Sequence, residues 1–379
     1  MKKTIILIIM LLLVLLPGVT VCAAEADDTE VLYEQQADLS GVSSLYSSLP
    51  DETKNLLSDM GISSADYKAL SETGVHDIFE KILSLAGTKG KTPFGAAAVC
   101  LGIMLLCAVV DGTNITMGDR SLSGVSSAVG ALCVCTAAVL PMCEVIKRST
   151  VIIQGASGFL MLYVPIMAGL MVSSGHEAAA GSYYTMLMGA GEIITQISAR
   201  FIAPFMNVFL ALSVTSSLSQ RLNLSVVCSS VYKCAKWVLT LGMSIFVTIL
   251  SAQTFITSSL DNVSKRALRF AVSSFVPVVG GVLSETVTAF SGSLELLKSG
   301  AGVFVIIASA CIFLPVLIEC ILWQFTLFFL SGAADIMGLG RMKSVFATIS
   351  TVASMLTAIL LCILTIFIIS TVVILIIAK

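Results

Sequence analysis

Long apolar stretches constrain this chain more than any other feature of its sequence. A helix that crosses a bilayer needs about 20 mostly apolar residues. Candidate stretches are residues 94–110, 121–146, 151–173, 182–219, 237–259, 267–289, 300–333 and 346–377. Backbone polar groups inside a bilayer must be paired within helices. The sequence therefore predicts an all-α, polytopic transmembrane bundle, in which the long stretches 182–219 and 300–333 each form a helical hairpin or two broken helices.

Charged residues are scarce and unevenly placed. Only 12% of residues are charged and 57% are hydrophobic, whereas soluble domains carry about 25% charged residues. Residues 25–93 hold thirteen acids and five bases, a net charge of −8, and residues 94–379 carry +4. No basic run indicates a nucleic-acid partner. The pattern predicts an acidic head followed by a membrane body.

The first 24 residues have the order of a secretory signal peptide. Two lysines precede an apolar run from Ile5 to Leu16, and the small residues Ala23 and Ala24 follow. This is the typical order of charged, apolar and cleavage regions. The alternative is an uncleaved anchor helix. A lipid-modified Cys22 is disfavoured because Val21 is large.

Residues 25–93 are predicted to form an acidic extracytoplasmic segment. Residues 25–49 lack apolar periodicity and are expected to be flexible. Three short amphipathic helices follow, and the glycines Gly61, Gly74 and Gly87 are predicted to end them. Each of these helices is too short to be stable alone, so they must pack on each other, on the membrane or on a partner.

The membrane body is divided into a first transmembrane pair, 94–150, and two copies of a weak repeat, 151–262 and 263–379. Basic residues are enriched in cytoplasmic loops, so Lys147-Arg148 and Lys265-Arg266 are expected in such loops. A translocated head followed by two simple crossings would place Lys147 on the other side. The sequence leaves the number of crossings and the orientation open.

The repeat is carried by proline and glycine landmarks about 112 residues apart. Proline in a membrane helix frees a carbonyl group, and paired broken helices are typical of transporter centres. The alternative is simple helix kinking and packing. The candidate helix-break or pore positions are Pro165, Gly169, Pro204, Asn207, Pro277, Gly281, Pro315 and Glu319.

Ionisable residues inside apolar stretches are a second set of candidates, because a charge at membrane depth usually faces a cavity or a partner. They are Glu144, Glu192, Arg200, Glu285 and Glu319. The repeat maps Asn207 onto Glu319, so both copies place a polar group just after their second proline. The alternative places Glu144, Glu192 and Arg200 near membrane surfaces.

Motifs of known enzyme chemistry are missing. The sequence has no phosphate-binding loop and no His-Glu-x-x-His or Cys-x-x-Cys pair. Most cysteines sit in apolar runs, where a thiol behaves as a small apolar group. We expect no enzyme activity, no cofactor and no metal.

The segment Phe275-Val-Pro-Val-Val-Gly-Gly281 and the earlier Tyr163-Val-Pro165 resemble the stage III sporulation protein AE family. The order of signal peptide, acidic head and multi-helix body is also similar. The resemblance implies a component of the complex that links mother cell and engulfed forespore in endospore-forming bacteria. It also implies a place in the mother-cell membrane around the forespore and a need for late forespore development. The family has no established catalytic residues.

Two functional hypotheses follow. The first is a membrane subunit of the sporulation channel complex, with other membrane subunits, the lipid bilayer and a second copy of the chain as candidate partners. The second is a secondary permease for a small solute, in which the repeats form two half-bundles and Glu319 takes part in transport.

Overall fold

The computed structural model describes residues 36–62 (except 38), 75–112, 116–117, 120–121, 123–197, 202–218, 230–249 (except 239, 243 and 247) and 280–377. Side chains are outside this description for several stretches within the helices, chiefly 75–83, 112–125, 280–296 and 373–377. The expected signal peptide therefore lies outside the described residues, as do Arg200 and Pro277.

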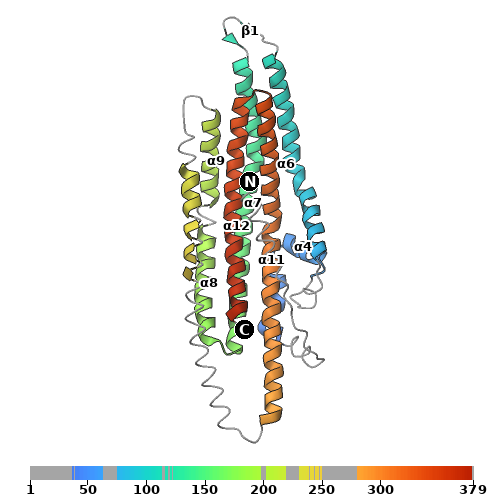
Figure 1. The fold of residues 1–379 in the computed structure, drawn as a ribbon, viewed down its shortest axis with the longest axis vertical. Helices are drawn as coiled ribbons and strands as arrows, with labels where there is room; N and C mark the ends of the chain where they lie inside the picture. The colour runs from blue at the N-terminus through green and yellow to red at the C-terminus, as the bar shows by residue number, and fades with distance from the viewer. Residues whose placement is uncertain are drawn as a thin grey trace.

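Within the described part of the chain, four long helices run side by side (Figure 1). Each is long and apolar enough to cross a membrane. Two short strands of two residues each, β1 (Thr116–Met117) and β2 (Arg120–Ser121), pair antiparallel between the first two helices. The prediction of a helical membrane bundle is confirmed. The helices are α6 (Val75–Gly112), α7 (Ser123–Ser173), α11 (Gly280–Ile336) and α12 (Gly340–Ile377).

Helix α7 is continuous through the charged residues at its middle. The 51 residues of this helix span about 77 Å at 1.5 Å per residue, far more than the roughly 30 Å of a bilayer core. The expectation that 121–146 and 151–173 are separate segments joined by a loop at Lys147-Arg148 is wrong. Residues 142–154 contain no glycine, proline or asparagine, so nothing in this stretch ends a helix.

Helix α11 is also continuous, from Gly280 to Ile336. The prediction of a hairpin or two broken helices in 300–333 is wrong, because α11 passes through Pro315 as α7 passes through Pro165. The same prediction for 182–219 is confirmed by two helices, α8 (Glu177–Ile197) and α9 (Ala203–Leu218). In Figure 1, α9 continues upward from the end of α8.

Glycines with positive φ end α7 and α11. Gly338 has φ 71°, and the next residue, Leu339, donates its backbone N–H to the Ala334 carbonyl at 2.9 Å. Gly175 has φ 79°, and His176 donates its backbone N–H to the Met171 carbonyl at 3.0 Å. Only glycine adopts this conformation without strain. These turns direct α12 back along α11 and α8 back along α7.

The acidic head lies against the bundle through two short helices, α3 (Ser43–Ser47) and α4 (Asp51–Asp59). Leu45 and Leu57 are buried in the same apolar core as the long helices. The predicted stop at Gly61 is confirmed, since its φ is 77°. The predicted stop at Gly87 is wrong because α6 continues through it, and residues 43–47, expected to be flexible, form α3. Gly74 lies outside the described residues.

Helices α11 and α12 form the centre of the bundle. Among the residues that the structure describes, 67% of the apolar part of each is buried, against 22% in α6 and 39% in α7. Large side chains such as Trp323, Phe313 and Phe346 are fully buried there. A helix surrounded by others can be apolar on every side, which explains why α12 carries no charged residue after Lys343.

Candidate functional site

A buried carboxylate at the middle of α11 is the centre of the candidate site. Glu319 is 2% exposed, and its Oε2 accepts a hydrogen bond from Arg148 Nη1 of α7 at 3.0 Å. The Arg148 side chain is 45% exposed. An unpaired charge in this position would cost several kcal/mol, so the structure places its counter-charge on the neighbouring helix.

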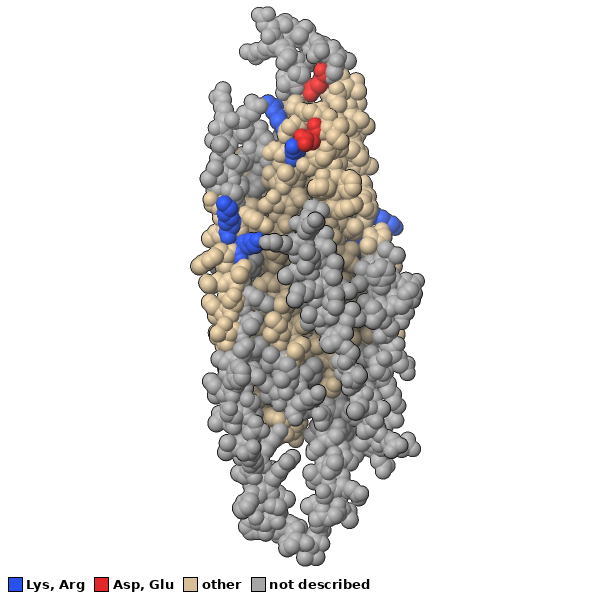
Figure 2. All heavy atoms as spheres, in the orientation of Figure 1, with Lys and Arg blue, Asp and Glu red and all other residues tan. Residues whose placement is uncertain are grey.

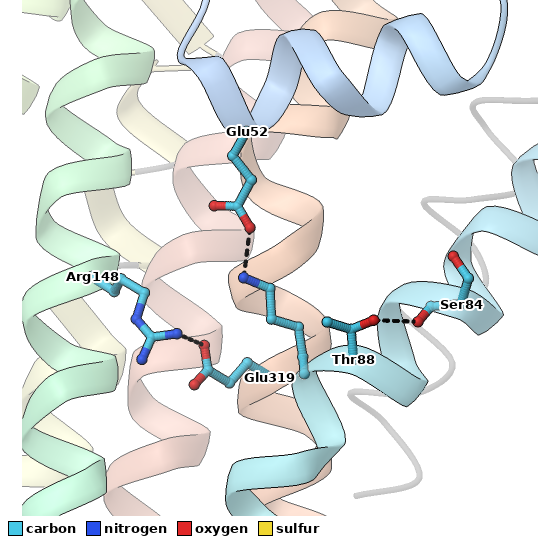
Figure 3. A network of polar contacts seen from close by, with 6 residues as sticks. Glu52, Ser84, Thr88, Arg148 and Glu319 are labelled. Atoms are coloured by element: carbon cyan, nitrogen blue, oxygen red, sulfur yellow. Dashed lines mark hydrogen bonds and ion pairs between the residues drawn. The ribbon is translucent and has the colours of Figure 1, made fainter.

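A second ion pair lies beside the first and connects the head to the bundle (Figure 3). Lys89 of α6 donates to Glu52 of α4, with 2.5 Å between Nζ and Oε1. Both residues are close enough to Glu319 to interact with it electrostatically. The four residues Glu52, Lys89, Arg148 and Glu319 are called the charged cluster below. The cluster joins four elements that are distant in the sequence.

Polar side chains follow the cluster into the core between α11 and α12. Gln324 donates its Nε2 to Thr357 Oγ1 at 2.8 Å, and the Thr357 hydroxyl donates to the Ala353 carbonyl at 2.9 Å. Cys320 is also fully buried. This arrangement places a carboxylate and hydrogen-bonded polar side chains inside an otherwise apolar bundle. Among the described residues it brings together no group of metal ligands.

On the outside of α7, the charges next to Arg148 are paired at the surface. Lys147 Nζ lies 3.0 Å from Glu144 Oε1, and both side chains are more than half exposed. Exposed pairs of this kind contribute about 0–1 kcal/mol. The three neighbouring charges of α7 therefore differ in role, because only Arg148 reaches the core.

The second proline of each repeat copy has different surroundings in the structure: one is buried in the core and the other lies at the surface. Pro315 and Glu319 are buried in α11, whereas Pro204 and Asn207 are exposed on α9. The equivalence of Asn207 and Glu319 is therefore not seen in their surroundings. Whether these residues act in the protein's function stays a prediction.

The other candidates lie on the outside or beyond the described part. Pro165 and Gly169 are on an exposed face of α7. Glu192 is exposed and accepts a hydrogen bond from Gln196 at 2.8 Å. Gly281 and Glu285 lie in the first turns of α11, where side chains are not described.

Sequence reasoning missed Arg148, Lys89 and Glu52 as members of the site. The sequence predicts a loop at Arg148 because this residue follows another basic residue between two apolar stretches. The signal that identifies it is the lack of any helix-ending residue around it, which keeps it on a helix at membrane depth. Nothing in the sequence indicates that Lys89 and Glu52 would meet, since 37 residues separate them.

Comparison with known proteins identifies the family. The family model described as stage III sporulation protein AE matches residues 66–378. The chain belongs to the stage III sporulation protein AE family. Family membership gives it a role in sporulation, and the described part of the chain holds four helices that are long and apolar enough to cross a membrane, as expected of a membrane protein.

A named relative in the stage III sporulation protein AE family supports the assignment. The chain is 23% identical over 168 residues to "Stage III sporulation protein AE" of Bacillus subtilis (strain 168). The matched region covers 44% of this chain and 42% of that relative. No solved structure matches the chain.

Proposed function

We propose that this protein is a membrane subunit of the channel complex that joins mother cell and forespore, and that it acts after engulfment in the mother-cell membrane. The observation that carries the proposal is the family match over residues 66–378. The proposed role is structural or conducting and needs no catalysis, cofactor or metal of its own.

The architecture supports a role in assembly. The head is held on the bundle by apolar contacts of Leu45 and Leu57 and by the Glu52–Lys89 ion pair. Outward-facing polar residues such as Asp51, which is 99% exposed, give the head a polar surface for partners to bind. Other membrane subunits and a second copy of this chain are the proposed partners.

The test is a clean deletion in the native spore former, followed through engulfment by microscopy with a late forespore reporter. We expect engulfment to finish, the reporter to stay dark, and the wild-type chain to restore it. Normal spores from the deletion strain would exclude the proposed role.

A secondary permease for a small solute is the second candidate, and the buried Glu319 carboxylate favours it. This function predicts solute flux through the purified protein in liposomes, abolished by Glu319→Gln. Glu144→Gln is the matched control, because Glu144 is an exposed acid near the same level of the bundle. Equal flux in both variants would exclude Glu319 as a transport residue.

A further inference from the structure

Most buried hydroxyl groups of the long helices are bonded to their own backbone. A helical serine or threonine can donate its hydroxyl proton to the carbonyl four residues earlier, which pairs the hydroxyl without help from another helix. The residues that do so here, at 2.7–3.0 Å, are Ser149, Thr150, Thr357, Ser370 and Thr371. A buried hydroxyl that does not make this bond is directed elsewhere.

Thr326 of α11 is an exception to this pattern. The residue is only 3% exposed, yet its Oγ1 makes no hydrogen bond with a protein atom. One turn earlier on the same helix, Trp323 is fully buried, and its Nε1 likewise has no protein partner. A hydroxyl or indole N–H that leaves water without a new partner destabilises the folded state. Both groups therefore need a partner that the chain does not supply.

These two groups lie on the face of α11 that carries Glu319. Trp323 follows Glu319 by four residues and Thr326 follows it by seven, and positions with this spacing are stacked on one face of a helix. By helical rise, Trp323 lies about 6 Å and Thr326 about 10.5 Å beyond the level of Glu319. We call Glu319, Trp323 and Thr326 the polar row.

The part of α11 that faces α12 is different, because its polar groups are paired. Gln324 donates to Thr357 at 2.8 Å, and Cys320 lies beside the same threonine. Within the polar row, Glu319 is paired with Arg148, whereas Trp323 and Thr326 have no protein partner. The need for an additional ligand is therefore specific to the polar row.

Water is the ligand that fits the chemistry of the polar row. An indole N–H can only donate a hydrogen bond, whereas a hydroxyl can both donate and accept. A water molecule accepts from the first and bonds to the second, and internal waters typically make about three such bonds. A cation finds no acceptor at the indole N–H, and an anion would be repelled by the Glu319 carboxylate.

We propose that ordered water is bound at the polar row, where it is hydrogen-bonded to Trp323 Nε1 and Thr326 Oγ1. The water reaches this site past Arg148, whose half-exposed guanidinium connects the surface with Glu319. Such a polar connection is uncommon on this molecule, since most of the described surface on the face drawn in Figure 2 is uncharged.

The site is an internal hydration site beside a buried carboxylate. It gives Glu319 a mobile polar neighbour inside the bundle in addition to the fixed Arg148 side chain. The inference rests on burial and hydrogen bonding alone. It depends neither on the proposed function nor on which level of the bundle the bilayer surrounds.

Trp323 itself is a spectroscopic probe of the site. The chain has two tryptophans, and Trp237 is 64% exposed, so Trp237→Phe leaves Trp323 as the single reporter. Ultraviolet resonance Raman spectra of the purified protein in lipid nanodiscs distinguish a hydrogen-bonded indole N–H from a free one. Transfer to D2O shows how fast its proton exchanges. We expect a hydrogen-bonded N–H that exchanges faster than the protein unfolds; a free N–H, or exchange only through global unfolding, would overturn the proposal.

Thr326→Val in the same background removes the hydroxyl and keeps the shape of the side chain. Because the water loses one of its partners, we expect the Trp323 band to move toward that of a free N–H. Thr371→Val is the matched control, since it removes an equally buried hydroxyl that is bonded to the Phe367 carbonyl at 3.0 Å. It should leave the band unchanged. An unchanged band in Thr326→Val, or equal shifts in both variants, would contradict a shared water.

Thermal unfolding of the same variants gives an independent readout. Removal of a hydroxyl that binds water should lower the melting temperature of Thr326→Val, whereas removal of a hydroxyl buried without any partner would raise it. Thr326→Ser keeps the hydroxyl and should retain the parent Trp323 spectrum. A raised melting temperature in Thr326→Val, or a free N–H in Thr326→Ser, would count against the hydration site.

Discussion

Replacing Arg148 by methionine tests the buried ion pair most directly. The change keeps an unbranched apolar stem but leaves Glu319, which is 2% exposed, without its hydrogen-bonded counter-charge. Removing one partner of a fully buried pair costs about 3–5 kcal/mol. Because Arg148 is 45% exposed and Lys89 remains near, we expect about 2–3 kcal/mol.

The converse change should be milder. Glu319→Gln leaves a half-exposed guanidinium that reaches water and still has an amide oxygen as acceptor, so the expected cost is about 1 kcal/mol. The double variant Arg148→Met with Glu319→Gln should be more stable than the sum of the two single changes predicts, with a coupling of about 1–2 kcal/mol.

The assay is reversible unfolding of the purified protein in lipid nanodiscs, measured for the four chains of this cycle. Lys147→Met is the matched control, since it removes the adjacent cation from an exposed pair and should cost at most about 0.5 kcal/mol. If Arg148→Met cost no more than Lys147→Met, the argument that burial makes Glu319 dependent on Arg148 would be refuted.

Three further changes test other parts of the structure. Lys89→Met should lower the free energy of unfolding by at most about 1 kcal/mol, because Glu52 is half-exposed. It should nevertheless raise the rate of hydrogen exchange in residues 42–62. Unchanged exchange would show that the Glu52–Lys89 pair does not hold the head on the bundle. Gly130→Ala should destabilise the bundle by about 1–3 kcal/mol, because the added Cβ would overlap Cys107 Sγ and Met342 Cε. Gly158→Ala on the same helix is the control in thermal unfolding, because a Cβ added there would meet no neighbouring atom within 4 Å. Gly338→Ala should cost about 1 kcal/mol through the positive φ at the α11–α12 turn, and an unchanged melting temperature would contradict it.

The sequence predicts the class of this fold because apolar stretches and helix-ending glycines are local signals. The stops at Gly61 and before α12 follow from such signals, and so does the break between α8 and α9. The continuity of α7 is harder to predict. A pair of basic residues between apolar stretches indicates a loop when only composition is considered, whereas the lack of a turn residue in 142–154 indicates a helix.

The candidate site is only partly predictable, for a physical reason. Glu319 is identifiable alone, because an acid in an apolar stretch needs a partner. Its partner is not identifiable, because the choice between Arg148, Arg200 and a lysine depends on which helices pack together. Likewise Pro315 and Pro204 have the same local sequence setting, yet α11 lies in the centre of the bundle and α9 at its edge.

The ion pair between Arg148 and Glu319 joins residues 171 positions apart, which sets an order of events during synthesis. At about 5–20 residues per second, Arg148 leaves the ribosome roughly 10–30 s before its partner exists. Throughout this interval the Arg148 guanidinium has no carboxylate partner and depends on water for its hydrogen bonds. The polar contact that joins α7 to α11 therefore forms only after most of the chain has been made.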